Sequence, residues 1–218
     1  MDARRLDIGE TVRFAWERTR TNLGLLVGLT VVAGISTIIP SSIAEWLQQP
    51  SPGLSALFRL IAFIISMLVS VGGVRIGLKI HDGQPVAVRD LFTADWSLFW
   101  RYVVASFLYS LVFGIGLILL VIPGIILGVR YFFYGYFVLE RGARPVQSLA
   151  QSAAATAGVR WDVFLFIGVL LLLVVLGAIL LGVGLLVTVP MAYIAAARAY
   201  RMLTKATPTA APSGVILA

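Results

Sequence analysis

The fold of this chain is decided by residues 99–139, FWRYVVASFLYSLVFGIGLILLVIPGIILGVRYFFYGYFVL, where two long apolar runs meet at Pro123-Gly124. A helix needs about 20 apolar residues to cross the hydrocarbon core of a bilayer. Each run is close to that length, proline ends a helix, and glycine lets the chain reverse. The stretch therefore predicts a membrane hairpin with spans at 99–122 and 124–139 and a structural turn at Pro123 and Gly124.

The composition of the whole chain indicates the same class of protein. Of its 218 residues, 60% are hydrophobic, 12% are charged and none is cysteine. Soluble domains are about 45–50% apolar and about 25% charged, so this chain cannot bury its apolar residues in one soluble core. The hydrophobicity excludes general disorder, and the lack of cysteine excludes disulfide scaffolds, zinc–cysteine sites and catalytic thiols. The remaining class is a polytopic membrane protein.

The other apolar stretches complete the predicted fold, with spans at about residues 23–39, 54–80, 163–182 and 184–203. Residues 163–203 would extend roughly 60 Å as one helix, so they must fold back, and Gly182 and Gly184 supply the turn. The prediction is an all-α membrane protein with six transmembrane helices in three helical hairpins. Residues 1–203 form a single membrane domain, and residues 204–218 form a flexible C-terminal tail.

The basic residues set the predicted orientation. The chain has 17 Lys+Arg against 10 Asp+Glu, and with the N-terminus inside, 15 of the 17 fall on the inner side; the exceptions are Arg59 and Arg130. An excess of basic residues marks the cytoplasmic side of membrane proteins. This pattern, with an arginine-rich composition typical of high-GC prokaryotes, predicts the prokaryotic cytoplasmic (inner) membrane with both termini cytoplasmic. The predicted inner basic rim comprises Arg75, Lys79, Arg101, Arg160, Arg198 and Arg201.

Three inner segments have amphipathic helical patterns but are not spans: residues 6–20, 88–99 and 146–157. Each precedes a pair of spans, so the chain repeats the order surface helix, span, span. Such helices lie in the membrane surface. The alternative is a helix packed on the cytoplasmic ends of the spans, which is the better interpretation for residues 146–157 because alanine contributes little membrane affinity.

Arg130 is the candidate ligand residue, because it lies near the middle of the fourth predicted span. A central arginine costs about 2.5–3.5 kcal/mol on insertion scales and usually faces the bundle interior or a water-filled cavity. No acidic residue lies inside a predicted span, so the expected partners of Arg130 are Ser106, Tyr109 and Ser110. Two interpretations stay open: an anion or lipid-headgroup site, and a structural arginine that snorkels or binds backbone carbonyls, which we favour.

Glycine pairs occur four residues apart at positions 24/28, 73/77 and 124/128. Glycine at this spacing lets two helix backbones approach closely. We expect these pairs to serve packing within the chain rather than dimerisation.

The sequence contains no catalytic constellation. His81 is the only histidine, and with Asp82 it lies in a predicted inner loop, where a solvated pair is a better interpretation than an acid–base pair. One histidine with scattered carboxylates does not make a metal-ligand set, and no nucleotide-binding, serine-hydrolase or zinc-protease motif occurs. We therefore expect a protein that is not an enzyme, with no metal, no cofactor and no nucleic-acid partner.

The segment that begins at Ile122-Pro123-Gly124-Ile125 resembles a group of prokaryotic integral membrane proteins. The group includes the membrane domain that precedes glycerophosphodiester phosphodiesterase catalytic domains, and related uncharacterised six-span families. The resemblance covers most of residues 8–203 and implies a six-helix membrane domain. It carries over no catalytic residue, because the catalytic domain of that group is a separate soluble barrel. The matching positions are Arg130, Val138-Leu139-Glu140, Ser148-Leu149 to Ser152, Gly158, residues 184–190 and Ala199-Tyr200-Arg201.

Two hypotheses for function follow from the sequence. The leading one is a non-enzymatic accessory or scaffold protein that binds a protein partner or lipid at its cytoplasmic face, through the amphipathic segments and the basic rim. The alternative is a small transporter or channel for an anionic or amphipathic solute, with Arg130 in the pathway. An enzyme that acts on lipid at the inner face has only His81, Asp82 and interfacial acids to support it. The expected partners are the lipid bilayer and either a protein partner or a second copy of the chain.

Overall fold

A computed structural model describes residues 6–92, 95–180 and 182–205, and these ranges are helical with short connections and no strand. The all-α prediction is therefore confirmed. The elements in chain order are α1 (Ile8–Thr21), α2 (Leu23–Trp46), α3 (Pro52–His81), the 3-10 helix η1 (Val88–Leu91), α4 (Trp96–Leu119), α5 (Val121–Tyr131), α6 (Tyr134–Arg141), α7 (Pro145–Ala155), α8 (Arg160–Ile179) and α9 (Leu185–Lys205).

Five helical segments of the described residues are long and apolar enough to cross a membrane: α2, α3, α4, α8 and the combined α5–α6 segment, Val121–Arg141. They support the assignment to the membrane class. The last helix, α9, is 21 residues long, but Arg198, Arg201 and Lys205 lie in its C-terminal half, and it is not one of the five. The prediction of six transmembrane helices is thus supported for five segments and not for α9.

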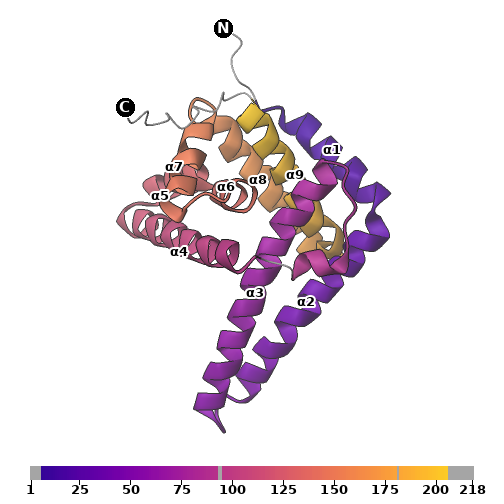
Figure 1. The fold of residues 1–218 in the computed structure, drawn as a ribbon, viewed down its shortest axis with the longest axis vertical. Coiled ribbons are helices and arrows are strands. Elements are labelled where there is room, and N and C mark those ends of the chain that lie inside the picture. The colour runs from indigo at the N-terminus through magenta and orange to yellow at the C-terminus, as the bar shows by residue number, and fades with distance from the viewer. Residues whose placement is uncertain (1–5, 93–94, 181, 206–218) are drawn as a thin grey trace, which may run out of the picture.

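The helices pair along the chain but do not form one parallel bundle. The pairs are α2 with α3, α4 with α5 and α8 with α9, and α9 also contacts α1, α2 and α3. In Figure 1 the α2–α3 pair projects well beyond the rest of the molecule, whereas α4 runs across the direction of α3. This arrangement leaves the far end of the α4–α5 pair uncovered, with Ile118 87% and Ile122 71% exposed.

Close contact between α3 and α9 depends on small residues. A Cβ added at Gly73 would lie 2.6 Å from the Tyr193 ring, and one at Gly77 would lie 2.6 Å from the Tyr193 carbonyl oxygen. The expected packing within the chain is therefore confirmed for this glycine pair. The same prediction is wrong for Gly24 and Gly28, where an added Cβ would meet nothing within 4 Å.

The first predicted span ends too early, because α2 continues through Pro40 to Trp46. Proline removes one backbone donor, the helical partner of the Ser36 carbonyl, but the helix continues on both sides of Pro40. Ser41 donates to the Thr37 and Ile38 carbonyl oxygens, at 2.9 and 2.8 Å. The predicted loop at residues 40–53 thus shrinks to the short connection between α2 and α3.

The turn expected at Pro123 and Gly124 is displaced to Leu120, which has extended backbone angles of φ −164° and ψ 137°. Pro123 lies in the first turn of α5, where backbone N–H groups have no partner within the helix. The lack of an N–H on proline therefore removes no helical hydrogen bond there. Gly124 is helical and serves a close approach: an added Cβ would lie 2.8 Å from the backbone nitrogen of Leu117.

The second predicted turn is confirmed. Gly182 has a φ of +75°, in the left-handed region that glycine adopts readily. Gly184 permits a close approach instead, because an added Cβ would lie 2.6 Å from the Cα of Gly177. The last apolar stretch therefore folds back at Gly182, as its length required.

The predictions for the three amphipathic segments differ in how well they agree with the structure. Residues 6–20 and 146–157 correspond to α1 and α7, and both pack on other helices. The single helix predicted over residues 88–99 is wrong: η1 ends at Leu91, and α4 begins at Trp96. Two residues of that segment, 93–94, and most of the predicted tail, 206–218, lie outside the described residues.

Two glycine substitutions test the packing of α3 against α9. We expect Gly77→Ala to destabilise the protein by about 1–3 kcal/mol, because its Cβ would collide with the backbone of α9. The matched control is Gly28→Ala, where open space leaves only the gain in helix propensity, about 0.5–1 kcal/mol. Thermal unfolding in detergent measures both. Equal melting temperatures for the two variants would contradict the packing described.

Candidate functional site

The combined α5–α6 segment is interrupted at Phe132-Phe133, between the end of α5 at Tyr131 and the start of α6 at Tyr134. The fourth predicted span, 124–139, is therefore a broken helix and not a continuous one. Helix ends leave backbone groups without helical partners, and inside a membrane such groups must find partners within the protein.

Two hydroxyls of the α7 region meet this need. Ser152 accepts a hydrogen bond from the Phe133 N–H at 3.1 Å and donates to the Arg130 carbonyl at 3.1 Å. Thr156 donates to the same carbonyl at 3.2 Å. Both side chains are fully buried. The α5–α6 break is thus closed by α7, which packs beside it.

Sequence reasoning missed this role, although a signal was present. Ser148, Ser152 and Thr156 recur every four residues in a segment otherwise rich in alanine, which places them on one face of a helix. All three are completely buried. Buried hydroxyls require hydrogen-bond partners, so a hydroxyl face on a short helix indicates a polar partner nearby.

Arg130 lies immediately before the α5–α6 break. Its side chain is half-buried, and its guanidinium carbon lies 5.5 Å from the centre of the Tyr131 ring. Its Nε atom is buried and has no hydrogen-bond partner among the described residues. The Tyr131 ring is thus the cation–π partner of this guanidinium, and among the described residues no carboxylate pairs with it.

Two of the three expected partners of Arg130, Ser106 and Tyr109, contact Tyr134 instead. The Tyr134 hydroxyl donates to Ser106 at 2.9 Å, and the Tyr134 and Tyr109 rings stack with their centres 4.9 Å apart. Ser110 is exposed. Among the described residues, no hydrogen bond joins these three side chains to the Arg130 guanidinium. The structure thus brings Ser106 and Tyr109 of α4 to Tyr134 of α6 without including Arg130.

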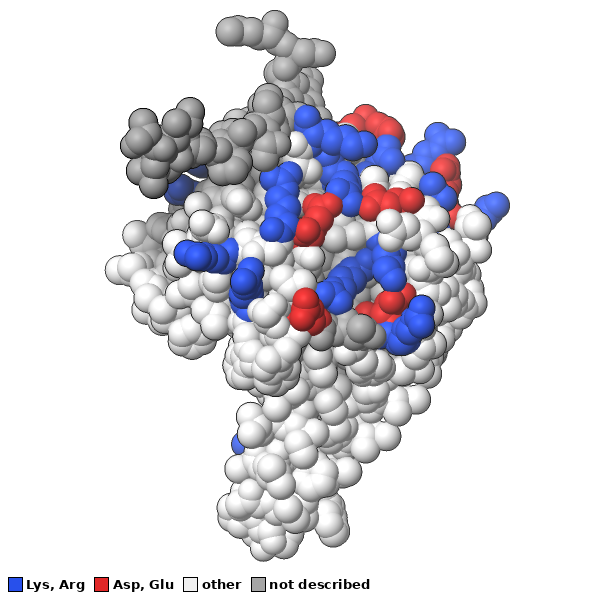
Figure 2. Space-filling model, in the orientation of Figure 1, with Lys and Arg blue, Asp and Glu red and all other residues white. Residues whose placement is uncertain are grey.

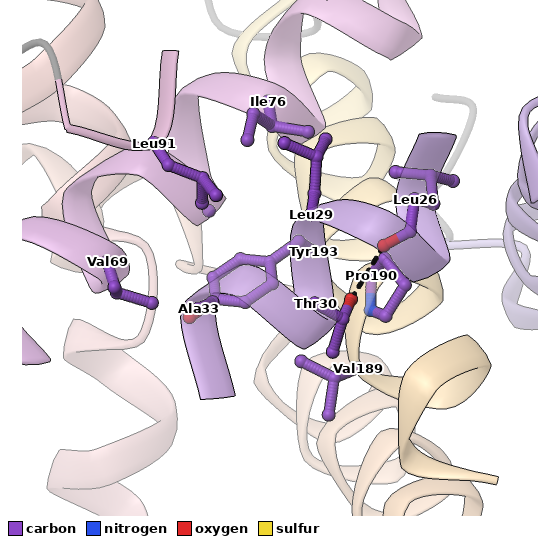
Figure 3. A pocket seen from close by; sticks show the side chains of 11 residues that line it. Leu26, Leu29, Thr30, Ala33, Val69, Ile76, Leu91, Val189, Pro190 and Tyr193 are labelled. Atoms are coloured by element: carbon purple, nitrogen blue, oxygen red, sulfur yellow. Dashed lines mark hydrogen bonds between the residues drawn. The ribbon is translucent and has the colours of Figure 1, made fainter. Parts of the chain in front are cut away.

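A small apolar cavity lies where α2, α3, η1 and α9 meet (Figure 3). Tyr193 occupies its middle, and the Thr30 hydroxyl near it donates to the Leu26 carbonyl at 2.8 Å. The volume is about 60 Å³, whereas sites for small-molecule ligands usually have about 300–1,000 Å³. This cavity is a packing defect and is too small for a solute pathway.

The charged residues gather at one end of the molecule. Figure 2 shows them over one half of the visible face, while the projecting part is almost free of charge. We call this surface the charged end; its ion-paired members are Glu10, Lys79, Asp82, Asp90, Glu140, Arg198 and Arg201.

Ion pairs join elements that are far apart in the sequence. Arg201 of α9 pairs with Asp82, which follows α3, at 2.5 Å, and also with Glu140 of α6. Arg198 of α9 pairs with Glu10 of α1. Together with the 2.8 Å pair between Lys79 and Asp90, these contacts connect α1, α3, η1, α6 and α9.

The same partners lower the pKa of two carboxyl groups. Burial raises the pKa of Asp82, but hydrogen bonds from His81 and Arg201 outweigh it, so the pKa lies below the ordinary value of 3.8. The hydrogen bond from Lys79 likewise lowers the pKa of Asp90. His81, 3.0 Å from Asp82, is therefore a member of this network.

The remaining residues of the predicted basic rim have separate surroundings. Arg75 lines a charged pocket of about 440 Å³ together with Lys79 and Arg201. Arg101 donates to the Gly142 carbonyl at 2.6 Å, where the chain leaves α6. Arg160 borders an apolar groove between α5 and α8. Three of the six residues thus line one pocket, whereas Arg101 and Arg160 have other contacts.

Comparisons of the chain with models of protein families, with curated proteins and with solved structures found no match. The resemblance to the glycerophosphodiester phosphodiesterase membrane domain stays a prediction.

A serine substitution tests how the α5–α6 break is closed. We expect Ser152→Ala to destabilise the protein by about 1–3 kcal/mol, because it leaves a buried N–H unpaired and removes one donor to the Arg130 carbonyl. The control is Ser36→Ala, since among the described residues the Ser36 hydroxyl bonds only to the Val32 carbonyl of its own helix. Chemical denaturation in detergent compares them. An unchanged stability of the Ser152 variant would refute the assigned role.

An arginine substitution combined with pH tests the charged end. We expect Arg201→Gln to cost about 2 kcal/mol at pH 7, between the values of exposed and buried ion pairs. Because the lowered pKa of Asp82 makes its carboxylate stabilise the folded state above about pH 4, this contribution disappears as the pH falls through that pKa. Melting temperatures from pH 7 to pH 2.5 should therefore converge for wild type and variant.

The control for this series is Arg13→Gln. Arg13 pairs with Glu17 at 3.1 Å on the exposed surface of α1, where ion pairs contribute little. A constant difference between wild type and the Arg201 variant at every pH would exclude Asp82 as the titrating partner.

Proposed function

We propose that this chain is a non-enzymatic, multi-pass protein of the prokaryotic cytoplasmic membrane, with both termini in the cytoplasm. It crosses the membrane six times through the pairs α2–α3, α4 with α5–α6, and α8–α9. Support comes from the five membrane-length segments and from the basic residues gathered at one end of the molecule, because such residues remain on the cytoplasmic side.

Its role is that of an accessory or scaffold protein that binds lipid or a protein partner at the cytoplasmic face. The observation that carries this proposal is the ion-paired charged end, where α9 is tied to α1, α3 and α6 through Arg198 and Arg201. Binding surfaces on rigidly held elements are well suited to recognition. The chain also exposes tryptophans, a residue type enriched at the level of lipid headgroups, and two of them adjoin basic residues in the sequence, Trp100 beside Arg101 and Trp161 beside Arg160. The other exposed ones near the predicted inner side are Trp16 and Trp96.

Of the two kinds of partner, we favour anionic lipid. Charged arginines beside exposed tryptophans match the interfacial region of a bilayer, where each basic residue near an anionic surface contributes about 1 kcal/mol. A protein partner would need a specific complementary surface in addition, and no feature described above selects one.

The alternative function is a transporter for an anion, with Arg130 in its pathway. The buried, unpartnered Nε of Arg130 favours it. Against it stands the closure of the neighbouring helix break by Ser152 and Thr156, because transporters use the freed backbone groups of broken helices to bind their solute.

Lipid retention tests the proposed function. The protein is reconstituted in nanodiscs of phosphatidylcholine with a minor share of phosphatidylglycerol, and the lipids retained after purification are quantified. We expect enrichment of phosphatidylglycerol, and a drop of about fivefold for each charge lost in the variant Arg13→Gln/Arg18→Gln/Arg20→Gln. Arg59→Gln is the control, because Arg59 lies near the opposite end of α3 and bonds to Gln48.

Two other outcomes would overturn the proposal. Equal retention of both lipids by the wild type would exclude recognition of anionic lipid, and a stoichiometric copurifying subunit would then make a protein the partner. A flux of chloride or inorganic phosphate across proteoliposomes that is lost in Arg130→Ala would favour the transporter.

A further inference from the structure

An apolar groove of about 550 Å³ lies between α5 and α8. One wall consists of Ile122, Ile125, Ile126 and Val129 of α5, which share one helical face. The other wall consists of Trp161 and Phe164 of α8, whose rings stack with their centres 5.2 Å apart. The volume lies within the range of about 300–1,000 Å³ that is usual for small-molecule sites.

The groove is open along its side. Ile122 is 71% exposed and Trp161 is 68% exposed, although both side chains are large and apolar over most of their surface. Contiguous apolar surface of this kind marks a contact with lipid, with a ligand or with another protein. An occupant can therefore enter from the side, without a channel through the protein.

Arg160 is the one charged residue in the lining of the groove. Within the described residues it has no carboxylate partner, whereas Lys79, Arg198 and Arg201 are all ion-paired. The nearby carboxylate of Asp162 accepts a hydrogen bond from the Leu6 N–H at 3.3 Å instead. The groove thus combines an apolar floor with an unpaired guanidinium, which is complementary to a molecule that is apolar along its length and anionic at one end.

We propose that the α5–α8 groove binds one anionic phospholipid, with an acyl chain between Ile126 and Phe164 and the phosphate at Arg160. Arginine donates two parallel hydrogen bonds to a phosphate, which adds geometric selectivity to the charge. Trp161 lies at the boundary between chain and headgroup, the place that its amphipathic ring favours. This inference rests on the proposed function, which places Arg160 in the cytoplasmic leaflet.

Selectivity must come from the headgroup. Every phospholipid of the bilayer can offer an acyl chain, and lipid tails are as apolar as the groove itself. The contribution that distinguishes one lipid from another is therefore the headgroup charge. The Arg160 guanidinium neutralises the one negative charge of phosphatidylglycerol, whereas the choline cation of phosphatidylcholine already compensates its phosphate.

Trp161 serves as a reporter in the groove. In the full-length chain, Trp16, Trp46, Trp96 and Trp100 are replaced by phenylalanine, so that only Trp161 fluoresces. This variant is reconstituted in phosphatidylcholine vesicles. A minor share of the lipid carries brominated acyl chains and is either brominated phosphatidylglycerol or brominated phosphatidylcholine. We expect brominated phosphatidylglycerol to quench Trp161 with an apparent affinity about fivefold higher than that of brominated phosphatidylcholine.

Matched variants assign the effect to Arg160. Arg160→Gln should remove the fivefold difference, Arg160→Lys should retain part of it, and Arg144→Gln, at another exposed position that precedes α7, should leave it unchanged. A second reporter with Trp46 as the only tryptophan, at the end of α2, should show no preference. Native mass spectrometry compares the wild-type chain with Arg160→Gln in a background that keeps all tryptophans. The variant should retain fewer phosphatidylglycerol molecules than the wild type.

The results separate this inference from the proposed function. Equal quenching of Trp161 by both lipids, while the nanodisc assay still shows retention of phosphatidylglycerol, would overturn the groove site alone. Equal lipid retention in nanodiscs would overturn the proposed function as well. Protection of Trp161 from both quenchers in a dimer that cross-links through α5 would show that a second copy of the chain fills the groove, and would overturn the lipid site.

Discussion

The arrangement of the second half of this protein depends on the hydrogen bonds by which Ser152 and Thr156 close the α5–α6 break. Without them, a buried carbonyl and a buried N–H would lack partners, at a cost of about 1–3 kcal/mol each. With them, α6 can leave the direction of α5, and Glu140 near its end reaches Arg201 of α9. A local defect in one helix is therefore linked to the ion pairs of the charged end.

The second organising element is α9, which contacts α1, α2, α3 and α8. It is tied at its charged end through Arg198 and Arg201, and it is packed closely along its length where Tyr193 meets the glycines of α3. This dual character explains why α9 is less apolar than the other long helices: much of its surface faces protein, and the charges at its end have partners. The α4–α5 pair has the opposite character, since its far end is apolar and exposed.

Sequence patterns predicted the helical stretches well where hydropathy alone decides them, and poorly where backbone geometry decides. The long apolar runs became helices, and Gly182 made the expected turn because its φ of +75° suits glycine. Pro123 misled the prediction, since proline is equally at home in the first turn of a helix. The break at Phe132-Phe133 gave no signal within its own segment, because aromatic residues are compatible with a continuous apolar helix; the signal lay in the hydroxyl face of α7.

What the sequence by itself determined is the all-helical, membrane-compatible class, because a chain with 60% hydrophobic and 12% charged residues has few other solutions. The tertiary structure decided which polar groups meet. Ser152 and Thr156 serve backbone groups that lie 19 to 26 residues earlier in the chain, and Arg201 pairs with Asp82, 119 residues away. Hydropathy is a property of local windows, whereas hydrogen bonds and ion pairs of this kind exist only after the helices have packed.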